Sequence, residues 1–246
     1  MAETETRTFR AATPAGELAL QIREGPRPSA SLILEGMFLI DSDSAESERA
    51  LAGLGLEALR RARGRAGVAP TRVRVLVGGL GLGITLRALL ELPGVGSVTV
   101  VEVFDPIVQW NRGPLANLNG GALEDPRVSC FVGDVREFLT GRPGAAEAIG
   151  PSDAFDLLLL DVDNGPTWLA LPSNAWLYSR DGLEVMRARM TPHSVAAFWA
   201  TERAPDFEAQ LADLAWGEWS YASVRTPVRP GEPPLECFIY FVVRAD

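Results

Sequence analysis

Short apolar runs alternate with amphipathic segments through the middle of the chain. The runs of strand length lie at residues 73–77, 97–102, 128–132, 157–160 and 194–199. Between them apolar positions recur at helical spacing, and helices are expected to begin near Gly83, Pro106, Val135 and Ser179. This alternation predicts an α/β, Rossmann-like, doubly wound sheet whose strands are mostly parallel.

The N-terminal part has a different pattern. Residues 1–14 are polar without a period and are expected to form a loose tail. Residues 17–23 and 31–41 alternate apolar and polar positions, which predicts a small β-hairpin or meander, and leucines at helical spacing predict a helix after it. We therefore divide the chain into residues 1–66, with the tail, hairpin and helix, and residues 67–246, the Rossmann-like domain.

The C-terminal part is expected to complete the sheet. A helix is predicted over residues 207–216, and strands are predicted over residues 221–226 and 238–243. The proline-rich residues 227–234 between the two strands predict a loop. The last strand is therefore expected to run antiparallel to its neighbours.

Charge and cysteine content exclude several classes of partner. The net charge of -9 argues against broad contact with nucleic acid, and the arginines of residues 60–65 are expected to offset the dipole at the end of a helix. Cys130 and Cys237 lie in apolar runs without further metal ligands at suitable spacing, so we expect buried thiols and no metal. No leader and no apolar stretch near ~20 residues is present, which predicts a cytoplasmic protein without a membrane span.

A glycine-rich turn follows the first strand of the predicted parallel sheet. Its glycines are Gly78, Gly79, Gly81 and Gly83. Glycine lets a ligand approach the backbone amides and the start of the next helix closely. Glu102 ends the following strand about twenty residues later, where a carboxylate accepts hydrogen bonds from both ribose hydroxyls. The pattern predicts a nucleoside site and still allows NAD.

A second acid favours a site for an adenosyl-sulfonium compound over a site for NAD. Asp134 follows the third strand at the carboxyl edge of the sheet, where we expect it to meet an adenine amino group. Glycine turn, ribose acid and this later Asp together favour S-adenosylmethionine or its decarboxylated form as the cofactor. The neighbouring Val103 and Val135 are assigned to the same pocket. An Asp that only caps the helix from Val135 is the alternative, and one residue can serve both roles.

Several of these segments resemble the spermidine synthases, the polyamine aminopropyltransferases. The resemblance covers roughly residues 30–200 and is most distinctive at Asp125-Pro126-Arg127-Val128, ahead of the Gly133-Asp134 turn. It implies the class I methyltransferase version of the Rossmann-like fold, a homodimer, and a catalytic Asp after the fourth strand. Asp161 occupies that position here.

The chain also departs from this family. Its glycine turn lacks the Asp that the family uses to hold the ammonium of the decarboxylated cofactor. Asn164 stands where the family has a second acid, and residues 44–48 replace a Tyr-His pair of the N-terminal helix. A carboxylate in the glycine turn would repel the carboxylate of intact S-adenosylmethionine, so its absence admits the intact cofactor. These departures argue against a polyamine acceptor.

The candidate catalytic groups follow the fourth strand of the sheet. Asp161, Asp163 and Asn164 lie where a doubly wound sheet places its ligands, and two close carboxylates raise a pKa and orient or deprotonate an amine. A tight turn held by the same residues is the alternative. Tyr178 belongs to a following segment, rich in proline and aromatic residues, that is expected to fold over the site, although its aromatic rings fit a core role equally well.

These residues support several functions. The first hypothesis is methyl transfer from intact S-adenosylmethionine to a small-molecule nucleophile, because displacement at a sulfonium needs mainly alignment. The second is aminopropyl transfer from decarboxylated S-adenosylmethionine to an amine, with Asp161 as base. Transfer or cyclisation of the aminocarboxypropyl arm is a third hypothesis. A regulatory protein that binds the nucleoside without chemistry is a fourth.

Overall fold

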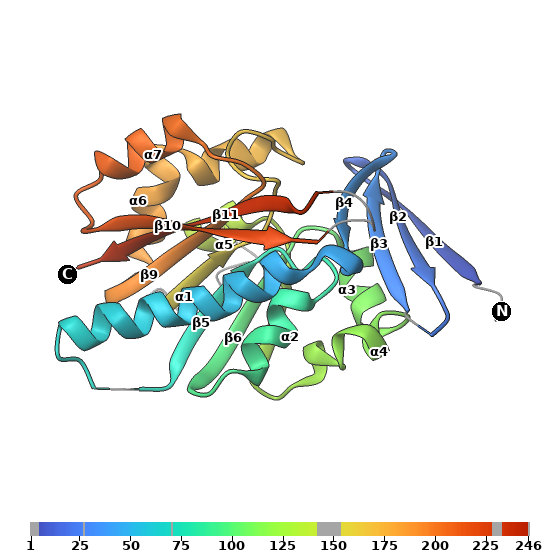
Figure 1. Ribbon diagram of the computed structural model, residues 1–246, viewed down its shortest axis with the longest axis horizontal. Helices are drawn as coiled ribbons and strands as arrows, with labels where there is room; N and C mark the ends of the chain where they lie inside the picture. Colours follow the sequence, from blue (N-terminus) through green and yellow to red (C-terminus); the bar gives the residue numbers. More distant parts are fainter. Residues whose placement is uncertain (1–4, 27, 70, 142–153, 228–232, 246) are drawn as a thin grey trace.

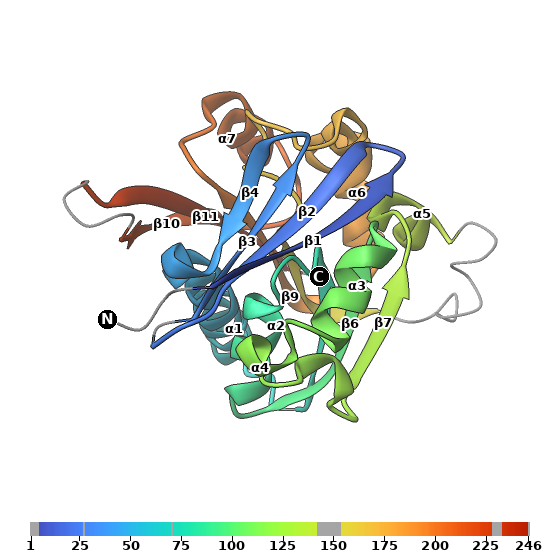
Figure 2. The same cartoon turned by 90° about the vertical axis from the view of Figure 1, so that its right-hand side faces the viewer.

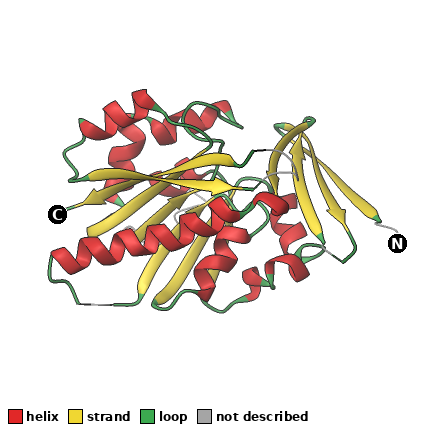
Figure 3. Cartoon of the chain, viewed as in Figure 1, coloured by secondary structure: helices red, strands yellow, loops and turns green. Residues whose placement is uncertain are grey.

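A seven-stranded mixed sheet forms the centre of the molecule (Figures 1 and 3). The computed structural model describes residues 5–26, 28–69, 71–141, 154–227 and 233–245. The strands of this sheet are Val73–Gly78 (β5), Val95–Glu102 (β6), Val128–Val132 (β7), Phe155–Leu160 (β8), Met190–Ala200 (β9), Trp219–Thr226 (β10) and Leu235–Arg244 (β11). Their order is β10-β11-β9-β8-β5-β6-β7.

The pairing of these strands confirms the predicted fold class. β5 to β9 form parallel pairs, whereas β11 runs antiparallel to both β9 and β10. From β5 the chain adds β6 and β7 on one side of the sheet, and then β8 and β9 on the other side. The direction in which strands are added therefore reverses next to β5. In an open sheet of this kind, ligands bind beyond the carboxyl ends of the strands at the point of reversal.

Helices cover both faces of the large sheet. The α-helices are Glu46–Arg65 (α1), Ile84–Glu91 (α2), Asp105–Arg112 (α3), Ala116–Asn119 (α4), Val135–Thr140 (α5), Arg180–Ala188 (α6) and Pro205–Ala212 (α7). Short 3-10 helices are Ser42–Ser44 (η1), Ala122–Glu124 (η2) and Pro172–Tyr178 (η3). α1, α2 and α3 share one apolar core with the sheet, and α5, α6 and α7 share the other (Figure 1).

A second, four-stranded antiparallel sheet corrects the expectation of a loose N-terminal tail. Its strands, in order, are Thr6–Thr13 (β1), Gly16–Arg23 (β2), Ser29–Leu34 (β3) and Met37–Asp41 (β4). β1 pairs with β2 along its whole length, so its backbone hydrogen bonds, and not an apolar pattern of its own, make it a strand. This sheet lies across one end of the larger sheet and shares the α1-side core (Figure 2).

Two element boundaries differ by four residues from the sequence prediction, the end of α7 and the start of β9. α7 ends at Ala212, although Leu214 and Trp216 beyond it are buried in the core and therefore extend the apolar pattern past the helix. β9 begins at Met190, before the predicted start at residue 194, and it includes an irregular position at His193, whose φ is 56°. Apolar positions mark burial, and burial continues past the end of regular structure.

The arginines at the end of α1 make local ion pairs. Arg63 Nη2 lies 2.5 Å from Asp156 Oδ1, and both side chains are largely buried. The other Asp156 oxygen accepts the backbone N–H of Arg74 at 2.7 Å. This network ties the end of α1 to β5 and β8. Within the described residues, none of the helices combines the length and apolar character that crossing a bilayer requires.

Candidate active site

A cavity of about 150 Å³ lies beyond the carboxyl ends of the parallel strands, where the four-stranded sheet meets the larger one. The two sheets, the start of α1 and the loop after β8 all contribute to its wall. The cavity is therefore at the position that a doubly wound sheet provides for a ligand.

The four glycines at the end of β5 and in the turn after it occupy two kinds of position. Gly79 and Gly81 line the cavity in left-handed conformations, with φ values of 87° and 52°. A Cβ at Gly79 would collide with the backbone carbonyl of Asp161. Gly78 and Gly83 do not line the cavity, and a Cβ at Gly83 would lie 2.5 Å from Asn111 Oδ1. Of the four glycines that the sequence assigns to cofactor binding, the cavity wall thus includes Gly79 and Gly81.

Glu102 lies next to the glycine turn. Its two carboxylate oxygens accept the backbone N–H groups of Leu80 and Phe104, each at 2.9 Å. The side chain is buried, and burial raises its pKa above the ordinary value. Glu102 also lines the cavity. The structure thus brings together the turn and the acid that the sequence placed about twenty residues apart, with Val103 beside them.

Asp134 both caps a helix and lines the cavity. Its Oδ1 accepts the backbone N–H of Arg136 at 2.7 Å, which caps the start of α5. Val135 also lines the cavity. The two alternatives that the sequence left open for Asp134 are therefore compatible in one residue, since a capping carboxylate has a second oxygen for a ligand.

Asp161 follows β8 and faces a second buried acid, Glu48 of α1. Asp161 Oδ2 accepts the hydroxyl proton of Thr85 at 2.8 Å, and Glu48 Oε2 accepts that of Ser47 at 2.7 Å. Burial raises the pKa of Asp161 to about 6. Burial, and then repulsion by Asp161, raise the pKa of Glu48 to about 7. Both residues line the cavity, and two close carboxylates favour a positively charged ligand there.

The sequence analysis did not identify Glu48. Residues 44–48 entered the prediction only as a segment that replaces a Tyr-His pair of the related family. The signal was present, because Glu48 falls on the same helix face as Leu51, Ala52 and Gly55, at the spacing of the buried positions. An acid on the apolar face of a helix is seldom fully buried without a partner or a function.

Asp163 holds the loop that covers the cavity. Its Oδ1 accepts the backbone N–H of Ala170 at 2.7 Å and the side-chain amide of Asn174 at 2.9 Å. The neighbouring Asn164 lines the cavity, and its carbonyl accepts the backbone N–H of Thr201 at 2.9 Å. The turn role, which the sequence analysis gave as the alternative for Asp163, thus describes its contacts.

Tyr178, which the sequence predicts as a catalytic residue, packs in the core behind the cavity wall. It is absent from the cavity wall, and its ring packs edge-on against Phe207 at a centroid distance of 5.6 Å and near Phe198 at 6.2 Å. Burial, followed by the charge of Asp163, raises the pKa of its hydroxyl well above the ordinary value. Tyr178 therefore stays protonated and supports the loop of Asp163 from behind.

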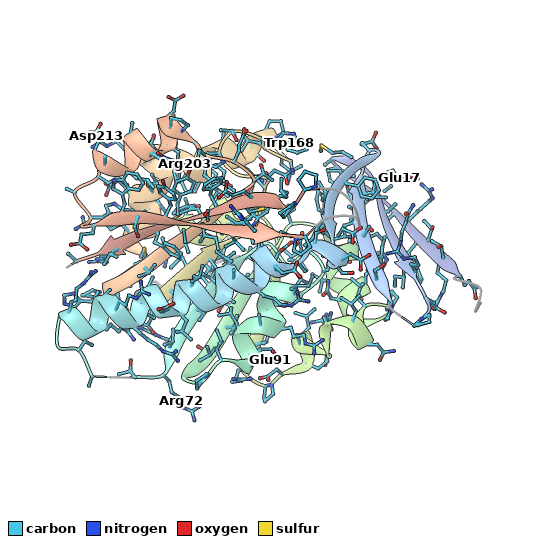
Figure 4. All side chains as sticks on the ribbon, viewed as in Figure 1. Glu17, Arg72, Glu91, Trp168, Arg203 and Asp213 are labelled. Carbon is cyan, nitrogen blue, oxygen red and sulfur yellow. The ribbon has the colours of Figure 1, made fainter. Side chains whose placement is uncertain are left out.

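The other aromatic residues of this segment also lie outside the cavity. Trp168 is 48% exposed on the surface (Figure 4), and Trp176 packs under the guanidinium of Arg136 at 5.1 Å. Trp199 of β9 lines the cavity instead, and the sequence analysis did not anticipate it. The sequence gives no direct signal for this, because the direction of a side chain depends on the strand register.

The charge of the cavity has one sign. The carboxylates in its wall are Glu48, Glu102, Asp134, Asp161 and Asp163. Among the described residues that line it, none is Lys, Arg or His. A largely buried site with this composition favours a cationic ligand and disfavours an anionic group.

Proteins with known names match this chain. It is 28% identical over 189 residues to a polyamine aminopropyltransferase of Mycobacterium tuberculosis, a match that covers 67% of this chain and 34% of that protein. It is 30% identical over 128 residues to a spermidine synthase of Dictyostelium discoideum, covering 51% and 39%. The match therefore spans less than half the length of these curated relatives. No family model matches the chain.

Solved structures have the same fold. Spermidine synthase from Thermotoga maritima superimposes with a TM-score of 0.64 at 15% identity, covering 96% of this chain and 72% of that one. A spermidine synthase in complex with the transition-state analogue AdoDATO gives a TM-score of 0.66 at 16% identity, covering 96% and 73%. The chain is a distant relative of the polyamine aminopropyltransferases.

The motif that most resembles the polyamine aminopropyltransferases has structural contacts here. Arg127 bonds to both carboxylate oxygens of Asp125, at 2.9 and 2.8 Å, and to the carbonyl of Leu90 at 3.0 Å. The guanidinium lowers the pKa of Asp125 to about 2. These bonds fix the entry into β7, at whose far end the chain turns into Asp134.

Proposed function

We propose that this protein transfers an aminopropyl group from decarboxylated S-adenosylmethionine to an amine. The observation that carries the proposal is the acidic cavity. Glu48 and Asp161 interact in its wall, and none of the described wall residues is basic. The similarity to polyamine aminopropyltransferases supports the same choice. Both favour aminopropyl transfer, the second hypothesis from the sequence, over methyl transfer.

The residues present fit the nucleoside and its cationic arm. The absent side chain of Gly79 leaves room against the backbone of Asp161, and Glu102 offers buried acceptors for ribose hydroxyls. Glu48 supplies from α1 the carboxylate that the glycine turn lacks. Two like charges about 4 Å apart cost roughly 4 kcal/mol at an effective dielectric constant near 20, so a ligand carboxylate beside Asp161 and Glu48 is strongly disfavoured.

The acidic pair also suits proton removal from the acceptor. An amine enters as an ammonium ion and becomes a nucleophile only after it loses a proton. The decarboxylated compound supplies a carbon next to a sulfonium, which is displaced without further activation. Asp161, with a pKa near 6, accepts the proton, and Thr85 holds its other oxygen in place. Glu48 stabilises the positive charge until transfer.

The test is release of methylthioadenosine from decarboxylated S-adenosylmethionine in the presence of primary amines. The proposal expects release that depends on both compounds and product masses larger by one aminopropyl group. Methylated products from intact S-adenosylmethionine would contradict it, and would return the methyltransferase hypothesis. Tight binding of the decarboxylated compound without turnover of any amine would instead support the regulatory hypothesis. The homodimer stays a prediction.

A further inference from the structure

The last glycine of the turn faces two buried asparagines and not the cavity. A Cβ at Gly83 would lie 2.5 Å from Asn111 Oδ1 and 3.2 Å from Asn119 Nδ2. Asn111 belongs to α3 and Asn119 to α4, and each is only 1% exposed. Neither of them lines the cavity. Glycine at position 83 is therefore explained by the close approach of these two side chains.

Asn111 joins the glycine turn to α3. Its Nδ2 donates hydrogen bonds to the carbonyls of Gly81 and Ile107, each at 2.9 Å. Its Oδ1 accepts a hydrogen bond from Asn119 Nδ2 at 2.7 Å. Asn119 Oδ1 in turn accepts the backbone N–H of Gly121 at 2.9 Å. Both side-chain amides are thus bonded at their nitrogen and at their oxygen, and we call Asn111 and Asn119 the asparagine relay.

The two ends of the asparagine relay fix the direction of both amides. The backbone N–H of Gly121 can only donate, so Asn119 turns its oxygen toward it and its nitrogen toward Asn111. Asn111 receives that nitrogen with its oxygen, which leaves its own nitrogen for the Gly81 carbonyl. A carbonyl can only accept, so the other end requires the same direction. A reversed Asn111 amide would leave buried oxygens facing one another, which is costly.

The glycine turn is held from two sides. Glu102, which lines the cavity, accepts the backbone N–H of Leu80 at 2.9 Å. Asn111, which lies outside the cavity wall, holds the carbonyl of Gly81. Gly81 itself lines the cavity at a φ of 52°, and glycine peptides in such a turn adopt several conformations when nothing holds them. The bond from Asn111 therefore decides which side of the peptide group after Gly81 meets a ligand.

We propose that Asn111 is a positioning residue for the nucleoside, because it holds the glycine turn in the conformation that admits the adenosyl group. Asn119 acts one step further away, by setting the direction of the Asn111 amide. This inference rests on the nucleoside binding that the proposed function requires, and is independent of which group is transferred. Both asparagines act through the turn, and the pair of Glu48 and Asp161 does not depend on them.

Asn111→Leu tests this role, since leucine is close to asparagine in shape and has no hydrogen-bonding group. In calorimetry, the dissociation constant of N111L for methylthioadenosine is expected to rise about tenfold or more. In the transfer assay, KM for decarboxylated S-adenosylmethionine is expected to rise by a similar factor, while kcat changes by less than about threefold. An unchanged dissociation constant in folded N111L would overturn the inference, and so would a loss confined to kcat.

Asn119→Leu is a milder variant, because Asn111 keeps its bond to Gly81 and loses only the bond that sets its direction. Its dissociation constant for methylthioadenosine is expected to rise about threefold. Asn117→Leu is the matched control on the same helix, since Asn117 is exposed, and it is expected to bind normally. Arg63→Met controls for lost stability, because it breaks a buried ion pair at the opposite edge of the sheet and is also expected to bind normally. Equal dissociation constants for N119L and N117L would contradict the relay.

Hydrogen exchange separates this inference from the proposed function. In the ligand-free protein, N111L is expected to raise the exchange rate of the Leu80 amide about tenfold, because the turn is released on one side, whereas the amides of β9 and β11 keep their rates. An unchanged rate at Leu80 would overturn the role of Asn111, whether or not any nucleoside binds. Failure of the unaltered protein to bind methylthioadenosine would contradict the proposed function, and the exchange rates would still decide whether Asn111 holds the turn.

Discussion

Replacement of Glu48 by glutamine tests the buried acidic pair through the stability of the protein. Glu48 is 6% exposed, and its pKa is raised from 4.5 to about 7. The folded state therefore binds more protons than the unfolded state between these values, so the Glu48 contribution to stability falls as pH rises through this window. Glutamine keeps the size of the side chain and removes the titration.

The magnitude follows from the shift in pKa. A difference of about 2.5 units, from 4.5 to 7, corresponds to roughly 3 kcal/mol, of which about 2 to 3 kcal/mol develops between pH 5 and pH 8. Urea unfolding of E48Q and of the unaltered protein is measured at both pH values. The free energy of unfolding of E48Q, minus that of the unaltered protein, is expected to rise by this amount from pH 5 to pH 8.

Glu46→Gln is the control, since Glu46 lies in the first turn of the same helix but is exposed. Its difference from the unaltered protein is expected to vary by less than about 0.5 kcal/mol over this range. An E48Q difference as flat as that of E46Q would refute the reasoning, because it would show that Glu48 is ionised at neutral pH without penalty.

Three further substitutions probe other parts of the account. Asp161→Asn is expected to lower kcat/KM for aminopropyl transfer by about 10² to 10⁴ while methylthioadenosine still binds, and a loss below tenfold in the transfer assay would remove Asp161 as base. Gly79→Ala is expected to abolish nucleoside binding in calorimetry, because the added Cβ collides with the Asp161 carbonyl. Gly36→Ala is the control, since Gly36 has a similar positive φ but open space around it, and this variant is expected to bind the nucleoside normally. Equal nucleoside affinities of the two variants would contradict the role of Gly79. Arg63→Met is expected to lower the free energy of unfolding in urea by about 1.5 to 3 kcal/mol because it removes the closer of the two arginine partners of the buried Asp156. Arg61→Met removes only an exposed pair with Glu57 and is expected to change it by less than about 1 kcal/mol, so equal losses would contradict the assignment.

The parallel sheet and the position of the site were predictable because local sequence determines both. β5, the glycine turn and α2 follow one another directly, and Glu102 ends the next strand. Parallel neighbours bring their carboxyl ends to one edge, so spacing along the chain translates into proximity. Asp161 and Asp134 were placed at the same edge for the same reason.

Residues whose roles depend on packing between distant segments were not predictable in this way. Glu48 reaches Asp161 only because α1 packs across β8 and β9. Tyr178 packs in the core and Trp199 lines the cavity, and neither position was predictable, since an aromatic residue in a loop or strand does not reveal which side it faces. β1 lacks an apolar period and owes its conformation to pairing with β2.

Binding of the two forms of the sulfonium compound tests the central claim most directly. Calorimetric titration of the purified protein with decarboxylated and with intact S-adenosylmethionine, under one set of conditions near pH 7.5, compares ligands that differ by a single carboxylate. The acidic cavity predicts that the decarboxylated compound binds at least about tenfold more tightly, given the repulsion between the extra carboxylate and the pair of Glu48 and Asp161. Equal affinities, or tighter binding of the intact compound, would contradict the account.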